Sequence, residues 1–260
     1  MTRFQIPEYQ LQRVDGGRRS LHRRVKDGGN DVRALKQSMK NSLRHLPPSM
    51  KTWIKTRSEL SYWKKRAKSE GDSFDNSHYQ QFFTELFNLT LSDFDGKSII
   101  DIGCGPRGSL EWAVGATRRV GLDPLAIEYT LLNRGVHAME YVAGSAESIP
   151  FAEGSFDYVS ALNSLDHVES VERAIDEMER VTAPSGSILL IVEVNHEPTV
   201  NEPHTLSTDI VERFTRCDVV DSALYGLAET HDIYRSINEG RSAADHEPGV
   251  LCAHLRKRAA

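Results

Sequence analysis

The stretch Ser98-Ile-Ile-Asp-Ile-Gly-Cys-Gly-Pro-Arg-Gly-Ser109 decides the fold of this chain. Its apolar first half is typical of a buried strand, and the glycines after it predict a tight turn ahead of a helix. Gly103 and Gly105 let the backbone turn sharply and approach a ligand closely, because glycine has no Cβ. Asp101 comes just before this turn, in position to hold the amine of a ligand.

Apolar runs and helical patterns alternate along the rest of the chain. They predict strands over 98–102, 119–122, 140–142, 156–162, 187–194, 219–224 and 250–255, and helices over 110–116, 125–134, 171–181 and 206–214. Such alternation, with nearly continuous apolar strands, is typical of an α/β fold with a doubly wound, mostly parallel sheet covered on both faces. Ligands bind such sheets at the carboxyl ends of the strands.

The first 92 residues differ from the rest in charge and in pattern. Residues 1–70 carry 18 Lys and Arg side chains against 6 Asp and Glu, whereas residues 71–260 carry 14 against 31. We expect a flexible basic arm over 1–29, an N-terminal helical cap over 30–92 and the main domain over 93–260. The cap shows helical stripes over 32–46, 50–67 and 77–88, separated by Pro47-Pro48 and by Gly71.

The composition excludes several classes of protein. The chain has 260 residues, of which 39% are hydrophobic and 27% charged, as in a globular protein. No apolar run approaches the roughly 20 residues that span a bilayer, and no apolar signal segment follows the N-terminus. Cys104, Cys217 and Cys252 are too few and too widely spaced for a disulfide framework or a zinc cluster. We therefore expect a cytoplasmic protein.

Four further motifs follow the glycine-rich turn in order. They are Gly121-Leu-Asp-Pro124, Ser145-Ala-Glu-Ser-Ile-Pro-Phe151, Gly154-Ser-Phe-Asp-Tyr-Val159 and Glu177-Met-Glu-Arg-Val-Thr-Ala-Pro-Ser-Gly186. Together with the D-x-G-x-G pattern of residues 101–105, they resemble class I S-adenosylmethionine (SAM) methyltransferases of the type 11 kind, over about residues 97–195. The resemblance implies a Rossmann-like sheet of seven strands and SAM as the cofactor.

The resemblance also implies where the cofactor lies. Asp101 would hold its ammonium group, and Asp123 would accept both ribose hydroxyls. Ser145 and its neighbours would read the adenine; many relatives have Asp there, so Glu147 is an alternative partner. Cys104 has a second interpretation as a small filler residue. The expected cofactor-binding residues are Asp101, Gly103, Cys104, Gly105, Asp123, Pro124, Leu125, Ser145, Ala146, Glu147 and Asn163.

A nicotinamide-dependent oxidoreductase is the rival interpretation of the same glycines. Gly103, Gly105 and Gly108 satisfy G-x-G-x-x-G, and Asp123 follows at the spacing of a dinucleotide fingerprint. However, an acid at Asp101 would repel a pyrophosphate, and Pro106 removes one N–H donor from the turn. SAM has no phosphate, and its ammonium group favours the acid, so the SAM interpretation is preferred.

The chemistry is expected in Asn163-Ser-Leu-Asp-His-Val168, just after the fourth strand. Methyl transfer needs an aligned nucleophile and, for a hydroxyl, removal of its proton. We expect His167 as the base, Asp166 as the residue that orients it, and Asn163 beside them. The alternative is that Asp166 caps the next helix and His167 packs beneath it.

The same segment resembles the E-x-x-E-H run of ubiquinone-pathway O-methyltransferases. In that family these residues are tied to a divalent metal near the acceptor oxygens, which implies a Mg²⁺ or Mn²⁺ site at Asp166 and His167. Because Asn163 stands where that family has its first acid, one charge is missing. A site without metal is therefore the main expectation.

Several residues elsewhere are candidates for binding the acceptor. The loop 195–204 brings His196 and His204 to the carboxyl end of the sheet. His78 and Tyr79 lie in the cap, and Arg107 follows the glycines. The alternatives are an ordinary polar loop, packing of Tyr79 in the core, and a surface salt bridge of Arg107.

The expected acceptor is a hydroxyl of a small molecule, such as a sugar or a biosynthetic intermediate. The alternatives are a nucleic-acid (RNA) methyltransferase that uses the basic N-terminal region and a SAM-binding regulator without catalysis. No RNA-binding module is recognisable, and residues 163–166 do not form the N-P-P-Y motif of base-modifying enzymes. We expect a monomer or a homodimer without a membrane span.

Overall fold

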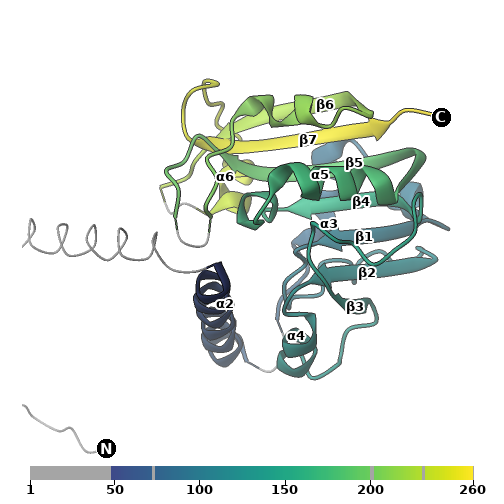
Figure 1. The fold of residues 1–260 in the computed structure, drawn as a ribbon. Coiled ribbons are helices and arrows are strands. Elements are labelled where there is room, and N and C mark those ends of the chain that lie inside the picture. The colour runs from purple at the N-terminus through teal and green to yellow at the C-terminus, as the bar shows by residue number, and fades with distance from the viewer. Residues whose placement is uncertain (1–47, 72–73, 200–201, 230–231, 260) are drawn as a thin grey trace, which may run out of the picture. The chain divides into compact units, whose positions relative to one another are not determined.

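The computed structural model describes residues 48–71, 74–199, 202–229 and 232–259 (Figure 1). They belong to one compact unit, Pro47–Ala260. The expected arm over 1–29 and the first helical stripe over 32–46 lie outside the described residues, and the domain boundaries stay predictions. Within the described ranges, no helix combines the length and the apolar character needed to cross a membrane.

Seven strands form one sheet in the order β3-β2-β1-β4-β5-β7-β6 (Figure 1). They are β1 (Ser98–Ile102), β2 (Arg118–Asp123), β3 (Glu140–Ala143), β4 (Phe156–Leu162), β5 (Thr182–Val194), β6 (Cys217–Gly226) and β7 (Gly249–Lys257). The first five strands pair in parallel, and β7 is antiparallel to β5 and β6. The predicted mostly parallel, Rossmann-like sheet is confirmed. The strand order reverses between β1 and β4, and a doubly wound sheet binds its ligand at such a reversal.

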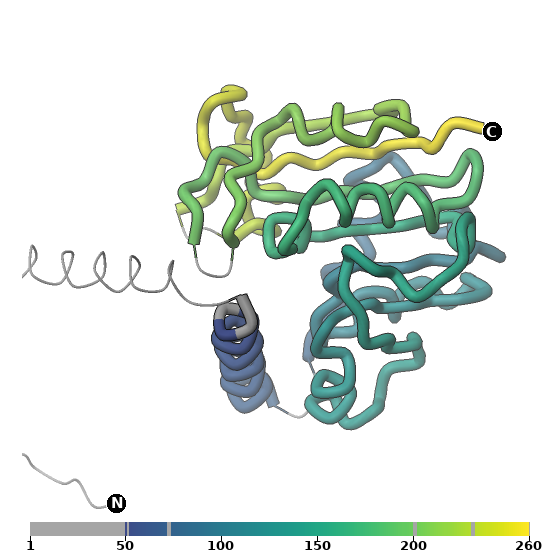
Figure 2. Tube along the Cα trace, viewed as in Figure 1, coloured from purple at the N-terminus to yellow at the C-terminus, as the bar shows by residue number. Residues whose placement is uncertain are grey.

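Helices accompany the sheet along the chain, as the Cα trace shows (Figure 2). The α-helices are α2 (Pro48–Glu70), α3 (Tyr79–Phe83), α4 (Ala126–Leu132), α5 (Val171–Val181) and α6 (Ile233–Glu239). Short 3-10 helices are η1 (Glu85–Phe87), η2 (Leu91–Phe94), η3 (Leu165–His167) and η4 (Thr208–Arg213). The predicted helix over 50–67 is present as α2, and it stops before Gly71 as expected.

Successive strand residues divide the core into two layers, because side chains alternate across a strand. Ile100 and Ile102 of β1 pack with Ile175 of α5 in one layer. Ile99 packs in the other layer with Phe82 of α3. The sheet is therefore packed between two apolar layers, one on each face, and polar residues lie at the carboxyl ends of its strands.

The predicted helix over 110–116 is wrong, since these residues form successive turns. Their hydrogen bonds span three residues: the N–H of Glu111 donates to the carbonyl of Gly108, and that of Ala113 to the carbonyl of Leu110. Gly108 has a φ of 75°, and Gly115 interrupts the pattern soon afterwards. Three-residue turns therefore replace the predicted helix between these two glycines.

Other elements differ from the prediction in detail. The helix over 206–214 is the 3-10 helix η4, and the helix over 77–88 is divided between α3 and η1. Helix α6 was not predicted. Residues 183–186, which precede the strand predicted over 187–194, also lie within β5, where a shift of register between Phe156 and Tyr158 accommodates them. Ser185 has a φ of 62° there.

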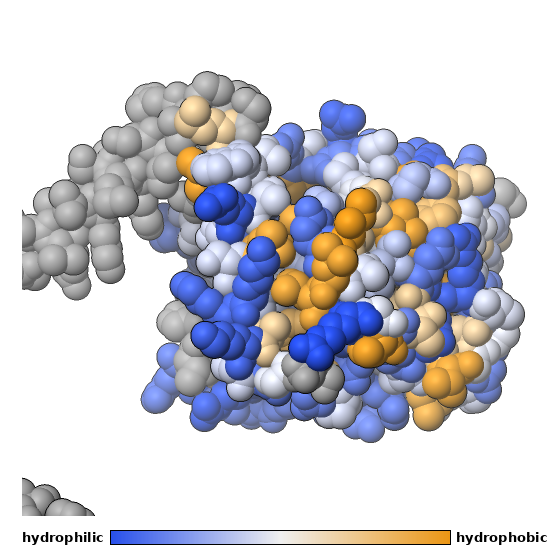
Figure 3. Space-filling view, turned by 90° about the horizontal axis from the view of Figure 1, so that it is seen from below, coloured by the Kyte–Doolittle hydropathy of each residue, from blue (hydrophilic) through white to orange (hydrophobic). Residues whose placement is uncertain are grey.

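The surface seen from below carries apolar side chains among charged ones (Figure 3). Among the exposed apolar side chains of the described residues are two from helix α4, Ile127, which is 66% exposed, and Leu131, which is 76% exposed.

Candidate cofactor and active site

The glycine-rich turn packs directly against the segment that follows β4. The N–H of Gly103 donates to the carbonyl of Leu122 at 2.7 Å, and Gly103 has a φ of 72°. A Cβ at Gly103 would lie 2.4 Å from the Cβ of Ser164. The hydroxyl of Ser164 in turn donates to the carbonyl of Ile102 at 2.6 Å. Glycine is therefore required by both backbone angle and space, and the turn is joined to residues 163–167.

Asp101 ends β1 as a buried carboxylate with satisfied oxygens. Ser160 of β4 donates to its Oδ1 at 2.7 Å, and Ser109 donates to its Oδ2. Burial raises the pKa of Asp101 to about 6, while the two serine hydroxyls act against that rise. The predicted role toward the ammonium of SAM stays a prediction.

Asp123 ends β2 and is also satisfied within the chain. Its Oδ1 accepts the N–H of Leu125 at 2.8 Å, and its Oδ2 accepts the N–H of Gly105 at 3.3 Å. Burial raises the pKa of Asp123 to about 7, and the negative charge of Glu59 adds to the rise. The second acidic motif is thus fixed beside the glycine-rich turn, as a ribose partner would need to be.

Three other expected cofactor-binding residues, Cys104, Pro124 and Leu125, lie next to these two carboxylates in the sequence and differ in burial. Cys104 is buried, with its Sγ 2.5 Å from the position that a Cβ on Gly121 would take. This contact supports its interpretation as a small filler. Leu125 is buried and Pro124 is exposed.

Helix α2 lies across this edge of the sheet, which sequence reasoning did not foresee. The hydroxyl of Tyr129 donates to Glu59 at 2.8 Å, which brings that carboxylate close to Asp123. Trp63 lies 3.6 Å from the Cβ position of Gly105. Nearer the start of the helix, the ammonium of Lys55 donates to the carbonyl of His167. The helical stripe predicted α2 but carried no signal of which surface it covers.

The third motif is held by the segment that leads into α5. One oxygen of Glu147 accepts the N–H of Glu169 at 2.6 Å and that of Ser170 at 3.3 Å. Ser145 pairs with Ser148 in an isolated bridge, and Ala146 is buried. Ser170, and not Asp166, caps α5 by accepting the N–H of Arg173. The predicted adenine contacts are not tested by this arrangement.

Polar side chains from the ends of β4 and β5 meet in a second group. We call it the β4–β5 cluster; its members are Asp166, His167, His196 and Glu202, and Asn163 precedes them directly after β4. Asp166 is fully buried. Its Oδ2 lies 3.9 Å from Nε2 of His167 and 3.7 Å from Nε2 of His196. Nε2 of His167 is also 3.8 Å from Oε1 of Glu202. Sequence reasoning missed Glu202, although it lies in the loop chosen for His196 and His204.

Most of these groups lack hydrogen bonds. Asn163 Oδ1, both oxygens of Asp166, and Nε2 of His167 and His196 are buried, with no partner in the part of the chain that the structure describes. Buried polar atoms are normally paired. Unpaired atoms that converge from two strand ends therefore indicate a place where a ligand binds.

The loop after β5 is tied to the segment after β4. Nε2 of His204 is 2.9 Å from the carbonyl oxygen of Val168, so His204 joins the two segments. Asn163 and Asn195, which directly follow β4 and β5, both have a φ of 59°. Backbone strain of this kind clusters at functional sites. His204 thus supports the contact between the two segments, whereas His196 belongs to the β4–β5 cluster.

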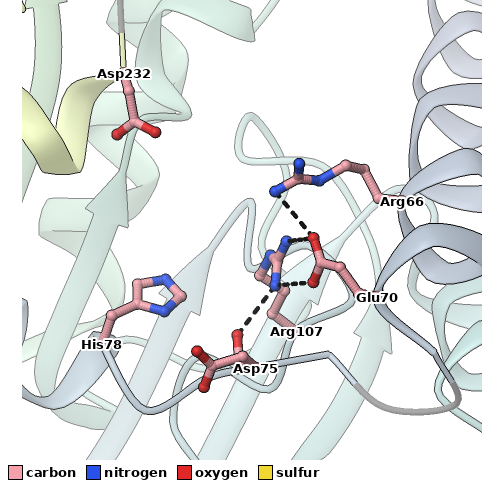
Figure 4. Close-up of a pocket in the computed structure, with 6 residues that line it drawn as sticks. All are labelled: Arg66, Glu70, Asp75, His78, Arg107 and Asp232. Atoms are coloured by element: carbon pink, nitrogen blue, oxygen red, sulfur yellow. Dashed lines mark hydrogen bonds and ion pairs between the residues drawn. The ribbon is translucent and has the colours of Figure 1, made fainter. Parts of the chain in front are cut away.

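A pocket of about 510 Å³ lies beside the glycine-rich turn (Figure 4). Its lining residues are Arg66, Glu70, Asp75, His78, Arg107 and Asp232. Arg107 donates to both oxygens of Glu70, at 2.8 and 2.7 Å, and lies over the rings of Trp63 and Phe74. Burial lowers the pKa of His78.

Two tyrosines lie behind this pocket. Tyr79 is buried and packs edge-on against Tyr234 of α6, with ring centroids 5.9 Å apart. Burial raises the pKa of both hydroxyls, and the negative charge of Asp101 adds to the rise. Tyr234 had no signal in the sequence, because α6 was not predicted. His78 and Arg107 thus line this pocket and Tyr79 packs against His78, while His196 belongs to the separate β4–β5 cluster.

Known proteins share both the motifs and the fold. Residues 100–190 match the model of a methyltransferase domain. Demethylmenaquinone methyltransferase of Renibacterium salmoninarum is 33% identical over 123 residues, which are 45% of this chain and 49% of that protein. Over residues 100–190, this chain is thus similar in sequence to known methyltransferases. Malonyl-[acyl-carrier protein] O-methyltransferase of Erwinia billingiae is 30% identical over 96 residues, 36% of this chain and 38% of that protein.

Solved methyltransferases have the same fold at low sequence identity. A methyltransferase of Haloferax volcanii, solved in complex with an activator protein, has a TM-score of 0.55 and 16% identity, covering 77% of this chain and 97% of that one. A SAM-dependent methyltransferase of Listeria monocytogenes has a TM-score of 0.51 and 15% identity, covering 64% and 93%. This chain spans less than half the length of the two curated relatives, so what they methylate is a property of those proteins.

Proposed function

We propose that this methyltransferase domain transfers the methyl group of SAM to a hydroxyl of a small-molecule acceptor. One observation carries the proposal. The segment 163–167 lies against the glycine-rich turn and presents buried polar atoms that have no partner among the described residues. A cofactor at the turn would bring its methyl group to these atoms, where an acceptor hydroxyl needs hydrogen bonds and a route for its proton.

The proposed reaction is an in-line displacement. The acceptor oxygen forms a bond to the methyl carbon, the bond from that carbon to sulfur breaks, and S-adenosylhomocysteine (SAH) leaves. The proton of the hydroxyl passes to the β4–β5 cluster. In this proposal Asp123 binds the ribose hydroxyls and Asp101 the ammonium group of the cofactor, each beside the Gly103–Gly105 turn.

A small acceptor agrees better with this site than a nucleic acid. Glu59, Asp166, Glu169 and Glu202 give the covered edge a negative charge around Lys55 and His167. That charge disfavours a phosphate backbone. By their names, the relatives given above act on demethylmenaquinone and on malonyl-[acyl-carrier protein]; the first of these supports a test with small organic acceptors.

Calorimetric titration of the full chain with SAH, and with NAD as the control, tests the cofactor. We expect SAH to bind and NAD to give no heat of binding. The acceptor is then sought by transfer of labelled methyl from SAM to separate sets of phenols, sugars, hydroxylated quinone precursors and RNA. Binding of NAD alone would overturn the proposal, and labelling of RNA but of no small molecule would replace the acceptor class.

A further inference from the structure

The buried carboxylate of Asp166 has no hydrogen-bond donor among the described residues. The side chain is fully buried, and both of its oxygens lack a partner in that part of the chain. Its Oδ2 faces a nitrogen of His167 at 3.9 Å and a nitrogen of His196 at 3.7 Å, and both distances are too long for hydrogen bonds. Burial also raises the pKa of Asp166, because a charge is costly away from water. A carboxylate in this state requires a ligand that brings donors or positive charge.

The neighbouring ring of His196 is oriented to accept a further hydrogen bond. Its Nδ1 lies 3.0 Å from the carbonyl oxygen of Glu197, and because a carbonyl only accepts, Nδ1 carries the proton. In the neutral ring, Nε2 then carries a lone pair. This nitrogen is buried, has no partner among the described residues and is the atom that lies 3.7 Å from Asp166. Asp166 and His196 therefore offer acceptors side by side.

Glu202 brings a second carboxylate to the cluster and is oriented by its own turn. Its Oε2 accepts the hydroxyl of Thr199 at 3.0 Å, and its N–H donates to the same hydroxyl at 3.0 Å. Its Oε1 faces Nε2 of His167 at 3.8 Å. The two carboxylates thus approach His167 from different segments of the chain, and the turn holds Glu202 in place before a ligand arrives.

The charge around the cluster is negative. Lys55 of α2 interacts with the charges of four carboxylates, those of Glu59, Glu147, Asp166 and Glu169. Glu202 adds a fifth beside His167. The ammonium of Lys55 donates to the carbonyl of His167 and leaves the oxygens of Asp166 without a donor. One cation does not balance this charge, so the site favours a positively charged ligand.

An alkylammonium group fits this set of acceptors. It carries one positive charge and three N–H donors. The cluster offers the unpaired oxygens of Asp166, Oε1 of Glu202 and Nε2 of His196. A neutral hydroxyl would supply one donor and no charge, and a carboxylate or a phosphate would be repelled. His167 lies within reach of both carboxylates, so it stays beside a ligand bound in this way.

We infer that the acceptor is a hydroxylated amine, such as an amino alcohol or a phenolic amine, whose ammonium group is bound by Asp166, Glu202 and His196. This inference names the substrate class and rests on the proposed function. The bound nitrogen keeps its proton and has no lone pair, so it cannot attack the methyl carbon, and the hydroxyl remains the nucleophile. Ser164, which packs against Gly103, joins this segment to the turn proposed to hold the cofactor.

The test compares molecules of nearly equal shape and different charge. One set is ethanolamine, ethylene glycol and glycolate, and the other is tyramine, para-ethylphenol and para-hydroxyphenylacetate. Each is titrated near neutral pH into the full chain saturated with SAH, in the presence of EDTA so that no metal contributes. Calorimetry and ligand-observed NMR measure binding. We expect the amine of at least one set to bind at least about tenfold more tightly than its neutral counterpart, and the anions not to bind.

Two substitutions locate the preference in the cluster. Asp166→Asn and Glu202→Gln should each weaken binding of the amine by about tenfold and leave binding of the neutral molecule unchanged, because each removes one negative charge. Glu197→Gln, the matched change at an exposed residue of the same loop, should change neither. Glu202 is partly exposed, so Glu202→Gln is expected to fold even if Asp166→Asn does not, which circular dichroism checks. An unchanged preference in the folded variants overturns the inference.

The remaining outcomes separate this inference from the proposed function. A chain that binds SAH but binds no amine, or binds the amines no better than the neutral molecules, overturns the inference and leaves the proposed function standing. Transfer of labelled methyl from SAM to the nitrogen of an amine also overturns it, since a bound ammonium has no lone pair. A preference for amines in a chain that does not bind SAH contradicts the proposed function alone.

Discussion

The two polar regions at the carboxyl edge of the sheet differ in how their groups are paired. Asp101 and Asp123 are hydrogen-bonded by neighbours close in the fold, namely two serine hydroxyls and two backbone N–H groups. In the β4–β5 cluster, by contrast, Asp166, His167 and His196 have buried atoms without a partner among the described residues. The first region is complete within the chain, whereas the second becomes complete only when something binds.

This difference predicts where a substitution affects folding and where it affects chemistry. Removing a group that is already paired leaves its partners unsatisfied and costs stability. Removing a group that has no partner until a ligand binds costs little folding stability and changes only ligand binding or turnover. The predictions below test this contrast from the largest expected effect to the smallest.

The largest effect is expected in the unpaired region. If His167 acts on the proton of the acceptor, His167→Ala lowers turnover by roughly 10²–10⁴-fold. SAH affinity and the urea midpoint should stay close to those of the wild type, because Nε2 of His167 makes no hydrogen bond with the described residues. The measurements are initial rates with the identified acceptor and titration with SAH.

His246→Ala, at an exposed histidine, is the matched control and should keep full activity. Full activity of His167→Ala would remove His167 from the reaction. A large loss of stability in that variant would show instead that the ring supports the fold, and the contrast between the regions would fail.

The boundary between the two regions should be sensitive to a single methyl group. Gly103→Ala places a Cβ 2.4 Å from that of Ser164, at a φ of 72°. Left-handed strain of about 1–2 kcal/mol and overpacking of about 1–3 kcal/mol together predict a loss of about 3 kcal/mol in the free energy of unfolding. Urea unfolding measures this loss.

Gly135→Ala is the control for the strain alone. Gly135 has a φ of 65°, and its Cβ position has no heavy atom of the described residues within 4 Å. We expect a loss of about 1–2 kcal/mol, from the backbone angle only. Equal losses at the two positions would mean that the contact with Ser164 carries no energy.

Sequence reasoning placed residues most accurately where the signal is local in the chain. The Asp101 and Asp123 motifs each lie at the end of a strand that an apolar run predicted, so their position followed from the pattern. The β4–β5 cluster depends on the loop after β5 folding back against the segment after β4. That return is set by contacts such as His204 with Val168, which no spacing in the sequence records.

The position of helix α2 over the site could not be predicted from the sequence either. The stripe of α2 predicted a helix, but Glu59, Lys55 and Trp63 are assigned to the edge of the sheet only by packing. The failed helix over 110–116 has a local cause instead. The apolar pattern predicts a helix there, whereas the positive φ of Gly108 and the three-residue turns after it replace the helix.

An effect of intermediate size is expected from pH in the paired region. The pKa of Asp123 is raised to about 7, so its carboxyl group is mostly protonated at pH 6 and mostly ionised at pH 8. If only the carboxylate accepts the ribose hydroxyls, SAH binds about tenfold more tightly at pH 8 than at pH 6. Titrations with SAH across this range measure the slope, and Asp123→Asn should remove it.

The contribution of Asp123 to the free energy of unfolding should change with pH in the opposite direction: it should fall as the pH rises, whereas SAH affinity should rise. The folded pKa of Asp123 is higher than its ordinary value, so the folded state binds the extra proton between those two values. The contribution of Asp123 to stability is therefore complete at low pH and is lost as the pH rises through about 7. If SAH affinity fell with rising pH, the assignment of Asp123 to the ribose would be wrong.

The smallest effect compares two residues with the same backbone strain inside and outside the site. Ser185 has a φ of 62° and Asn163 a φ of 59°. Ser185→Gly should raise the free energy of unfolding by about 0.5–1 kcal/mol, since glycine adopts this angle without a steric penalty. Asn163→Gly should raise the free energy of unfolding by less, because asparagine tolerates the angle better.

The amide of Asn163, however, lies in the unpaired region, so Asn163→Gly should lower turnover while Ser185→Gly leaves it unchanged. Urea midpoints and initial rates of both variants decide the point. If Asn163→Gly kept full activity, the side chain of Asn163 would have no part in the reaction, and the residue would only form the turn after β4.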